Sequence, residues 1–140
     1  MIHINRILLI DDDIISTTLS LKILRDMNIS TTITSETCGK EALKTLSHCI
    51  PEANTPNSMP DLILVDINMP GMNGFEFADA FNEMMKGKLN CTKIAIITSS
   101  SLIRNRVNAH LNPSISDYLN KPISPSHVKE LKSFQPTQAA

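Results

Sequence analysis

The chain has 140 residues, of which 41% are hydrophobic, and its formal net charge at pH 7 is -1. A chain of this length and apolar content folds as one ordinary globular domain, which needs neither disulfide bonds nor a structural metal. The near-zero charge, with no long run of one sign, argues against nucleic acid as the main partner, because a phosphate backbone requires clustered Lys and Arg.

Membrane and secretory features are also lacking in the sequence. No apolar stretch approaches the roughly 20 residues of a membrane-spanning helix, and the first 13 residues are too short and end too acidic for a signal peptide. The three cysteines Cys38, Cys49 and Cys91 are far apart, with no CxxC motif. They are predicted to be free thiols in a reducing compartment. We therefore expect a cytoplasmic protein with no membrane partner.

Five short segments are predicted to be strands, three of which are apolar runs. Residues 7–10, 62–65 and 94–97 are continuous runs rich in branched residues, and each ends abruptly in polar residues. Such runs are typical of strands that are covered on both faces, as in parallel sheets. Weaker strands are predicted at 31–35 and 115–119.

A helical pattern follows each predicted strand. Ile15, Leu19, Ile23 and Met27 recur at i+4 steps and form one stripe of a first helix, with Asp13 or Ser16 as its cap. Further helices are predicted around 42–46, 77–85, 102–111 and 124–134. The alternation predicts a doubly wound α/β fold in a single domain over 1–134, with a long loop at 51–60 and a tail at 135–140.

Polar residues gather at the predicted carboxyl ends of four strands, where the site of such a fold lies. In chain order they are Asp11-Asp12-Asp13, Asp66, Thr98-Ser99-Ser100 and Lys121-Pro122. Two carboxylates about 4 Å apart repel by about 1–4 kcal/mol, so a cluster of them must protonate, splay or hold a cation. Oxygen ligands suit Mg²⁺, which usually accompanies phosphate.

Each of these residues also has a simpler structural interpretation. For Asp13, a helix cap is favoured; for Asp11 and Asp12, directly after a buried run, a metal site is favoured over a plain turn. Asn73 is interpreted as the cap of the helix that follows. Together with Pro70-Gly71 it would hold the loop after Asp66 in a fixed shape, which a nucleophile requires.

With these motifs in place, the chain resembles the receiver domain of two-component response regulators. The motifs are ILLIDDD at 7–13, DLILVDINMPGMNG at 61–74, IAIITSS at 94–100 and DYLNKP at 117–122. The resemblance implies a flavodoxin-like receiver fold, in which a five-stranded parallel sheet of order 2-1-3-4-5 is flanked by five helices.

The resemblance also implies a role for each matching residue. Asp66 matches the aspartate that accepts a phosphoryl group from a phosphohistidine. Asp11, Asp12 and Asp66 match the Mg²⁺-binding carboxylates, and the backbone carbonyl of Asn68 matches a further metal ligand. Thr98 and Lys121 match the hydroxyl and the ammonium that contact the phosphoryl group. Thr98 and Tyr118 match the pair that switches conformation, although Tyr118 is as well explained as an ordinary half-buried tyrosine. Asn68 and Ser100 match positions that tune the lifetime of the phosphoryl group.

The implied output is a change in the surface formed by helix four, strand five and helix five, at about 101–134. Because only about six residues follow this surface, we expect a stand-alone domain that acts through separate proteins. Its partners would be a sensor histidine kinase or a histidine phosphotransfer protein, and a downstream effector. The segment Asn112-Pro113-Ser114 departs from the family, which has small residues there.

Two alternatives remain. The DxD pattern of Asp11-Asp12-Asp13 also fits a haloacid dehalogenase-like phosphatase with Asp11 as nucleophile. Such enzymes need further metal-binding acids after the lysine, and Glu130 is the only acidic residue that follows Lys121. A pseudo-receiver that serves only as a docking module is disfavoured because all the expected site residues are present. We predict that the protein is not a turnover enzyme and needs no cofactor beyond Mg²⁺.

Overall fold

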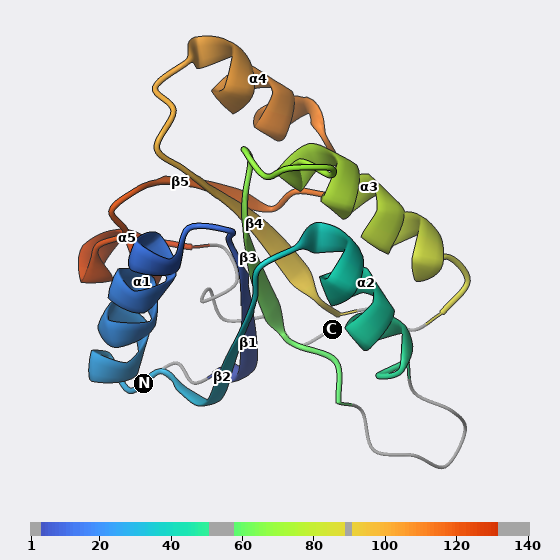
Figure 1. The fold of residues 1–140 in the computed structure, drawn as a ribbon, viewed down its shortest axis with the longest axis horizontal. Coiled ribbons are helices and arrows are strands. Elements are labelled where there is room, and N and C mark those ends of the chain that lie inside the picture. The colour runs from blue at the N-terminus through green and yellow to red at the C-terminus, as the bar shows by residue number, and fades with distance from the viewer. Residues whose placement is uncertain (1–3, 51–57, 89–90, 132–140) are drawn as a thin grey trace, which may run out of the picture.

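The computed structural model describes residues 4–50, 58–88 and 91–131, a part of the chain in which five strands alternate with five helices (Figure 1). The strands are β1 (Ile4–Ile10), β2 (Ser30–Glu36), β3 (Leu62–Asp66), β4 (Lys93–Thr98) and β5 (Asp117–Asn120). The helices are α1 (Ile14–Asp26), α2 (Gly39–Ser47), α3 (Gly74–Met84), α4 (Ile103–Leu111) and α5 (Pro125–Lys129).

All strand pairs are parallel, and the strand order is β2-β1-β3-β4-β5, which confirms the predicted doubly wound fold. β3 lies at the centre, and all five of its residues are buried. Its apolar side chains alternate between the two faces of the sheet, so that Ile63 and Val65 belong to one core cluster and Leu62 and Leu64 to the other. A continuous apolar run is therefore what a strand with two covered faces requires.

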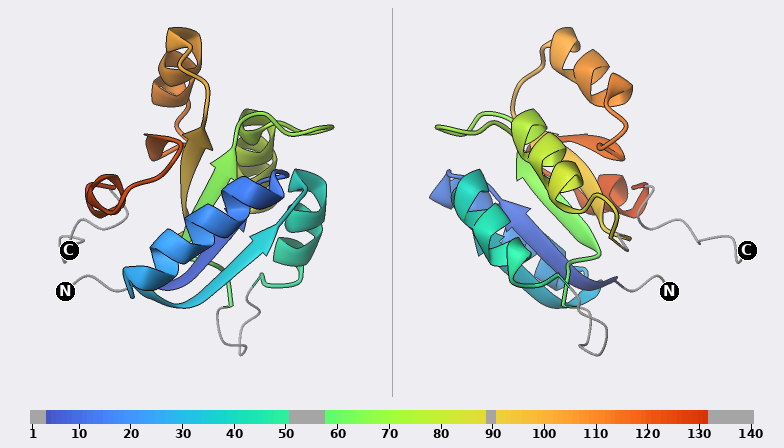
Figure 2. Two further views of the ribbon diagram at one scale, coloured as in Figure 1. Left: turned by 60° about the vertical axis from the view of Figure 1, so that its left-hand side comes forward. Right: turned by 90° about the vertical axis from the view of Figure 1, so that its right-hand side faces the viewer.

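The helices form a layer on each face of the sheet (Figure 2). Helices α2 and α3 contribute Leu46, Phe77 and Phe81 to the first core cluster. Helices α1 and α5 contribute Leu24 and Val128 to the second. The carboxyl ends of β1, β3 and β4 lie side by side at one edge of the sheet, which is where the polar motifs lie.

The predicted first helix is present, but only the second half of its apolar stripe, Ile23 and Met27, packs against the core, and both residues are partly buried. Ser20 and Leu24 are the buried residues of α1, whereas the side chains of Ile15 and Leu19 are 73% and 53% exposed. The i+4 spacing thus predicted the helix correctly, while the contacts of the helix with the sheet centre on Ser20 and Leu24, beside the stripe.

Two predicted boundaries were wrong. β5 comprises Asp117–Asn120, so the predicted range 115–119 began too early. α5 ends at Lys129, before the predicted end at 134. The tail at 135–140, most of the loop at 51–60 and residues 132–134 lie outside the described residues. Among the residues that the structure describes, no helix has both the length and the apolar character to cross a membrane.

Candidate functional site

The site forms where the carboxyl ends of neighbouring strands meet. Asp11 follows β1 directly, and Asp66 and Thr98 are the last residues of β3 and β4. Lys121 follows β5, and its backbone N–H donates to the carbonyl oxygen of Thr98 at 2.7 Å. Because these strands are parallel neighbours in register, four residues far apart in the chain lie at one edge of the sheet.

Three carboxylates form a cluster at this edge. Asp11, Asp12 and Asp66 each offer a carboxylate oxygen, and these oxygens all lie within 4.8 Å of one another. Asp11 and Asp66 are buried, whereas Asp12 is exposed. Buried like charges at this separation repel strongly, so the cluster requires a compensating positive charge.

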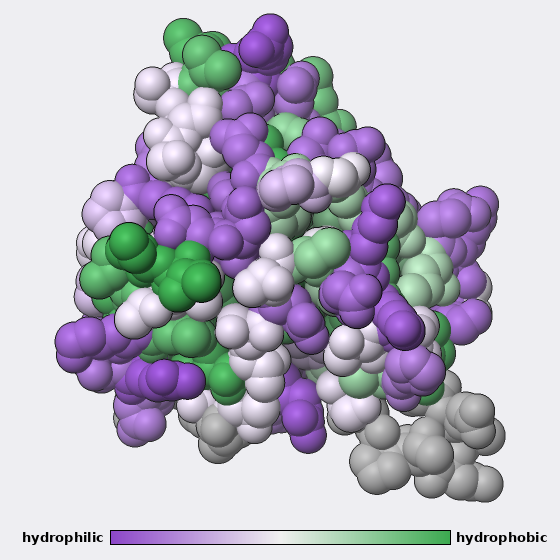
Figure 3. Space-filling view, in the orientation of Figure 1, coloured by the Kyte–Doolittle hydropathy of each residue, from purple (hydrophilic) through white to green (hydrophobic). Residues whose placement is uncertain are grey.

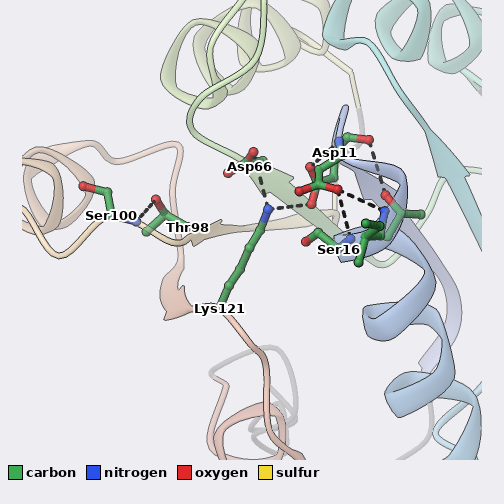
Figure 4. A network of polar contacts seen from close by, with 9 residues as sticks. Asp11, Ser16, Asp66, Thr98, Ser100 and Lys121 are labelled. Atoms are coloured by element: carbon green, nitrogen blue, oxygen red, sulfur yellow. Dashed lines mark hydrogen bonds and ion pairs between the residues drawn. The ribbon is translucent and has the colours of Figure 1, made fainter.

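Lys121 supplies part of that charge (Figure 4). Its ammonium lies 2.6 Å from Oδ2 of Asp11 and 3.5 Å from Oδ2 of Asp66. The lysine side chain is only 13% exposed, and the Asp11 side chain is fully enclosed. Since both partners of the shorter ion pair are withdrawn from water, removal of either one would leave an uncompensated buried charge.

The Asp66 carboxyl is perturbed by its surroundings. Burial is the largest influence and raises the pKa of the Asp66 carboxyl above its ordinary value. The ammonium of Lys121 opposes this rise, and the negative charges of Asp11 and Asp12 add to it. The carboxylate of Asp66 is therefore poorly solvated and surrounded by like charge, which favours the approach of a cation or an electrophile.

Asp13 is not part of the acidic cluster. Its Oδ1 accepts hydrogen bonds from the backbone N–H groups of Ile15 and Ser16, at 3.0 and 3.2 Å. It is therefore the N-cap of α1, which confirms the interpretation as a helix cap. The Asp13 backbone N–H also donates to Oδ1 of Asp11 at 3.0 Å, so the start of α1 orients the Asp11 carboxylate.

The loop after Asp66 is held by the start of α3. Asn73 and Glu76 form a capping box, with reciprocal bonds of 2.8 and 3.0 Å between side chains and backbone. A Cβ atom at Gly74 would lie 2.6 Å from the carbonyl oxygen of Asp66. Only glycine permits this approach, a requirement that the sequence pattern did not reveal because Gly74 is also explained as part of a turn.

Thr98 is buried, and its hydroxyl points toward the β4–α4 connection (Figure 4). Its Oγ1 accepts a hydrogen bond from the backbone N–H of Ser100 at 3.0 Å. The hydroxyl of Ser100 in turn accepts from the side-chain amide of Asn105 at 3.1 Å. Asn105 was not singled out from the sequence, because an Asn within a weak helical pattern carries no signal of its own.

Tyr118 is half-buried on β5, and the guanidinium carbon of Arg106 lies 5.1 Å from the centre of its ring. This cation–π contact fixes the aromatic ring against α4. Asn68 is exposed in the loop after Asp66. The roles assigned to Asn68, Ser100 and Tyr118 stay predictions.

The donor set fits Mg²⁺. All the clustered ligand atoms are carboxylate oxygens, the ligand type that this hard cation prefers. With three carboxylates and one ammonium, the formal charge of the group is -2, which a divalent cation would balance. The acidic pocket is therefore compatible with Mg²⁺.

Comparisons with known proteins agree with this geometry. The sequence profile of the response regulator receiver domain matches residues 7–132. The chain is 31% identical over 128 residues to the two-component response regulator ORR6 of Oryza sativa subsp. japonica, which covers 91% of this chain and 68% of that protein. It is 30% identical over 127 residues to ORR5 of Oryza sativa subsp. indica, with coverage of 91% and 85%.

Solved structures show the same fold. A two-component response regulator from Cytophaga hutchinsonii superposes with a TM-score of 0.80 at 30% identity, over 91% of this chain and 92% of that one. The receiver domain of the histidine kinase CKI1 from Arabidopsis thaliana, crystallised with Mg²⁺, gives a TM-score of 0.73 over 83% and 82%. At 21% identity, the second likeness shows the fold alone.

The fold and the position of the site define an α/β domain whose acidic cluster lies at the carboxyl edge of a parallel sheet. The chain belongs to the response regulator receiver domain family, which functions in two-component signalling.

Proposed function

We propose that this receiver domain is switched by phosphorylation of Asp66, with Mg²⁺ bound beside it. The observation that carries the proposal is the position of the Lys121 ammonium between the buried carboxylates of Asp11 and Asp66. In one small site, Asp66 would serve as the nucleophile, Asp11 as a ligand for the cation, and Lys121 as a positive charge for the phosphoryl oxygens.

The proposed reaction is a transfer between two side chains. A carboxylate oxygen of Asp66 attacks the phosphorus of a phosphohistidine on a sensor histidine kinase or a histidine phosphotransfer protein. An oxygen–phosphorus bond forms as the phosphorus–nitrogen bond breaks, and its electron pair stays on the imidazole, which takes up a proton. The product is an aspartyl phosphate on Asp66.

The surrounding residues have distinct tasks in this proposal. Asp11, Asp12, Asp66 and the backbone carbonyl of Asn68 would hold Mg²⁺, which when bound neutralises charge on the phosphoryl oxygens. Lys121 would exchange its contact with Asp66 for a phosphoryl oxygen. Thr98 would donate its hydroxyl to another, once it turns toward Asp66.

The hydrogen bonds of the site favour Asp66 over Asp11 as the nucleophile. Both carboxylate oxygens of Asp11 are occupied, Oδ1 by the N–H of Asp13 and Oδ2 by Lys121. The longer contact of 3.5 Å between Lys121 and Asp66 leaves that carboxylate less constrained. This difference argues against the phosphatase alternative, in which Asp11 would attack.

The surface beside the site has the character that a docking protein requires. Ile14, Ile15 and Leu19 of α1 are 75%, 73% and 53% exposed, and Figure 3 shows the hydrophobic patch over this helix. A groove of about 300 Å³ separates this helix from the segment after Lys121, and Ile15, Leu19 and Lys121 are among its lining residues. A phosphodonor protein that covers the patch would bring its histidine to the site and exclude water.

The proposed output lies on α4, β5 and α5, where Leu102, Ile103 and Leu111 are exposed. A separate effector would read the change of this surface. We expect Asn68 and Ser100 to tune the phosphoryl lifetime, and we expect one phosphoryl group per domain rather than turnover. A cytoplasmic location stays a prediction.

Phosphorylation of the purified protein tests the proposal. The wild-type protein and Asp66→Asn are incubated with Mg²⁺ and acetyl phosphate or phosphoramidate, and bound phosphate is measured by intact mass and by hydroxylamine lability. We expect one labile phosphoryl group on the wild-type protein and none on the variant. Equal labelling of both would refute the assignment of Asp66, and many turnovers that depend on Asp11 would establish the phosphatase reaction instead.

A further inference from the structure

Helix α4 is weakly held by the core. Ala109 is the buried residue among its nine, and Ile103, Val107 and Leu111 are exposed. Figures 1 and 2 show the helix standing away from the sheet, beyond β5. Since little apolar surface fixes this helix, its position depends on the polar contacts at its two ends and on the contact of Arg106 with the Tyr118 ring.

The N-terminal end is tied to the site through hydrogen bonds of Ser100. Its hydroxyl accepts from the backbone N–H of Leu102 at 3.2 Å and from the amide of Asn105 at 3.1 Å. Leu102 occupies the N-cap position and makes no side-chain cap bond, so Ser100 links the residue before the helix to the Asn105 side chain in its first turn. The backbone N–H of Ser100 donates to Oγ1 of Thr98. The chain of bonds therefore runs from the first turn of α4 to the hydroxyl of Thr98.

The C-terminal end is tied to a different element. The side-chain amide of Asn112 donates to Oδ1 of Asp79 on α3 at 3.0 Å, and its Oδ1 accepts from the backbone N–H of Ser114 at 2.8 Å. No residue of the acidic cluster takes part in these contacts. This end of α4 therefore has no direct hydrogen bond to the acidic cluster.

We propose that Ser100 and Asn105 form a latch, which holds Thr98 and the N-terminal end of α4 in the arrangement of the unphosphorylated protein. The contact between Asn112 and Asp79 is the fixed point about which that end of the helix moves. The latch rests on the proposed phosphorylation of Asp66. When Thr98 turns its hydroxyl toward a phosphoryl group on Asp66, its hydrogen bond with the N–H of Ser100 breaks. The bonds from Ser100 to Leu102 and Asn105 are then free to rearrange.

Asn105 is a positioning residue in this mechanism, since it acts on Thr98 only through Ser100. A hydrogen bond to a neutral side chain is worth about a factor of two to ten in an equilibrium constant. Asn105→Ala removes one bond from the latched state and leaves the site itself intact. The released state should therefore be populated about two- to ten-fold more often, and phosphorylation should accelerate by the same factor.

The chain offers matched variants for the test. Asn105→Ala and Asn112→Ala remove the same side-chain amide from opposite ends of α4. Asn105→Asp keeps the size of the side chain and can accept a hydrogen bond from the Ser100 hydroxyl, which restores the latch. All three keep the residues of the acidic cluster, Lys121 and Thr98.

Two measurements decide the outcome. The first is the rate of labelling by acetyl phosphate with Mg²⁺. The second is the fluorescence of Tyr118 without phosphate, which reports on a single residue because the chain has one Tyr and no Trp. We expect Asn105→Ala to be labelled about two- to ten-fold faster, with its fluorescence shifted toward that of the phosphorylated wild-type protein. Asn105→Asp and Asn112→Ala should keep the wild-type rate and fluorescence.

Other results would overturn the latch. Labelling of Asn105→Ala at the wild-type rate, or an equal acceleration in Asn112→Ala, would show that Asn105 does not hold Thr98. If the wild-type protein takes no label while Asp66 is intact, the proposed function fails and the latch fails with it. Failure of the latch alone is recognised by normal labelling of the wild-type protein and an unchanged Asn105→Ala.

Discussion

Replacing Lys121 by Gln should destabilise the protein strongly without metal and only weakly with it. The substitution keeps most of the side-chain stem and removes the ammonium that lies 2.6 Å from Asp11 and 3.5 Å from Asp66. The formal charge of the cluster, from three carboxylates and one lysine, changes from -2 to -3. Water screens the remaining carboxylate charges only weakly, because the Asp11 side chain is fully enclosed.

The size of the effect follows from this burial. Removing one partner of a buried ion pair costs about 3–5 kcal/mol. The partial exposure of Lys121 lowers the value somewhat, so we expect the free energy of unfolding to fall by about 2–4 kcal/mol at pH 7 in EDTA. With about 10 mM Mg²⁺, a bound cation compensates the carboxylates and the loss should drop to about 1 kcal/mol or less.

Urea unfolding followed by circular dichroism measures both values. Lys22→Gln is the matched control, because Lys22 forms an ion pair with Asp26 at 3.0 Å while both side chains are largely exposed, 73% and 66%. Such a pair contributes less than about 1 kcal/mol and should not respond to Mg²⁺. If Lys121→Gln cost no more than the control in EDTA, or if Mg²⁺ left its cost unchanged, the electrostatic description of the site would be wrong.

Two further predictions concern the aspartate and the loop behind it. Because the folded protein binds a proton on Asp66 more tightly than the unfolded chain, the free energy of unfolding in EDTA falls as pH rises from the ordinary pKa of this carboxyl through its raised value. Asp66→Asn removes this fall, so its stability advantage over the wild-type protein should grow as the pH rises above the ordinary pKa of an aspartate, about 4. A difference independent of pH in urea titrations would contradict the raised pKa. Gly74→Ala should cost about 1–3 kcal/mol in urea unfolding, because its Cβ would lie 2.6 Å from the backbone oxygen of Asp66, which has no room to yield. Gly39→Ala is the control at the start of another helix, since its Cβ would meet only the flexible side chain of Met72 at 3.2 Å and should be nearly neutral; an equal loss in both variants would show that the contact with Asp66 is not special.

Several parts of the fold could be predicted from local sequence because the physics behind them is local. The three apolar runs form the buried parts of β1, β3 and β4. A strand that is covered on both faces needs apolar residues at successive positions, which makes it recognisable in the sequence. The caps at Asp13 and Asn73 were also predictable, because a side chain that accepts from backbone two or three residues ahead needs no distant partner. The short β5 and the end of α5 were less certain, as their patterns are brief and their limits depend on packing.

The buried face of α1 shows where local pattern stops being informative. Its i+4 stripe through Ile15 and Leu19 predicted a helix, and a helix formed, but Ser20 and Leu24 face the sheet. Periodicity gives the period of a helix and not its rotation when the apolar residues are spread around it. The rotation was decided by the core, and it left an apolar patch beside the site.

The sequence by itself determined which residues could act in this protein, because acidic pairs, a hydroxyl and a lysine stand directly after strand-like runs in a fixed order. Only the tertiary structure decided which of these residues contact one another. The ion pair between Asp11 and Lys121 joins residues 110 positions apart, and the bond from Ser100 to Thr98 depends on how the β4–α4 connection turns. Such contacts arise from the closing of the sheet and the packing of its helices, and no local pattern of residues encodes their distances.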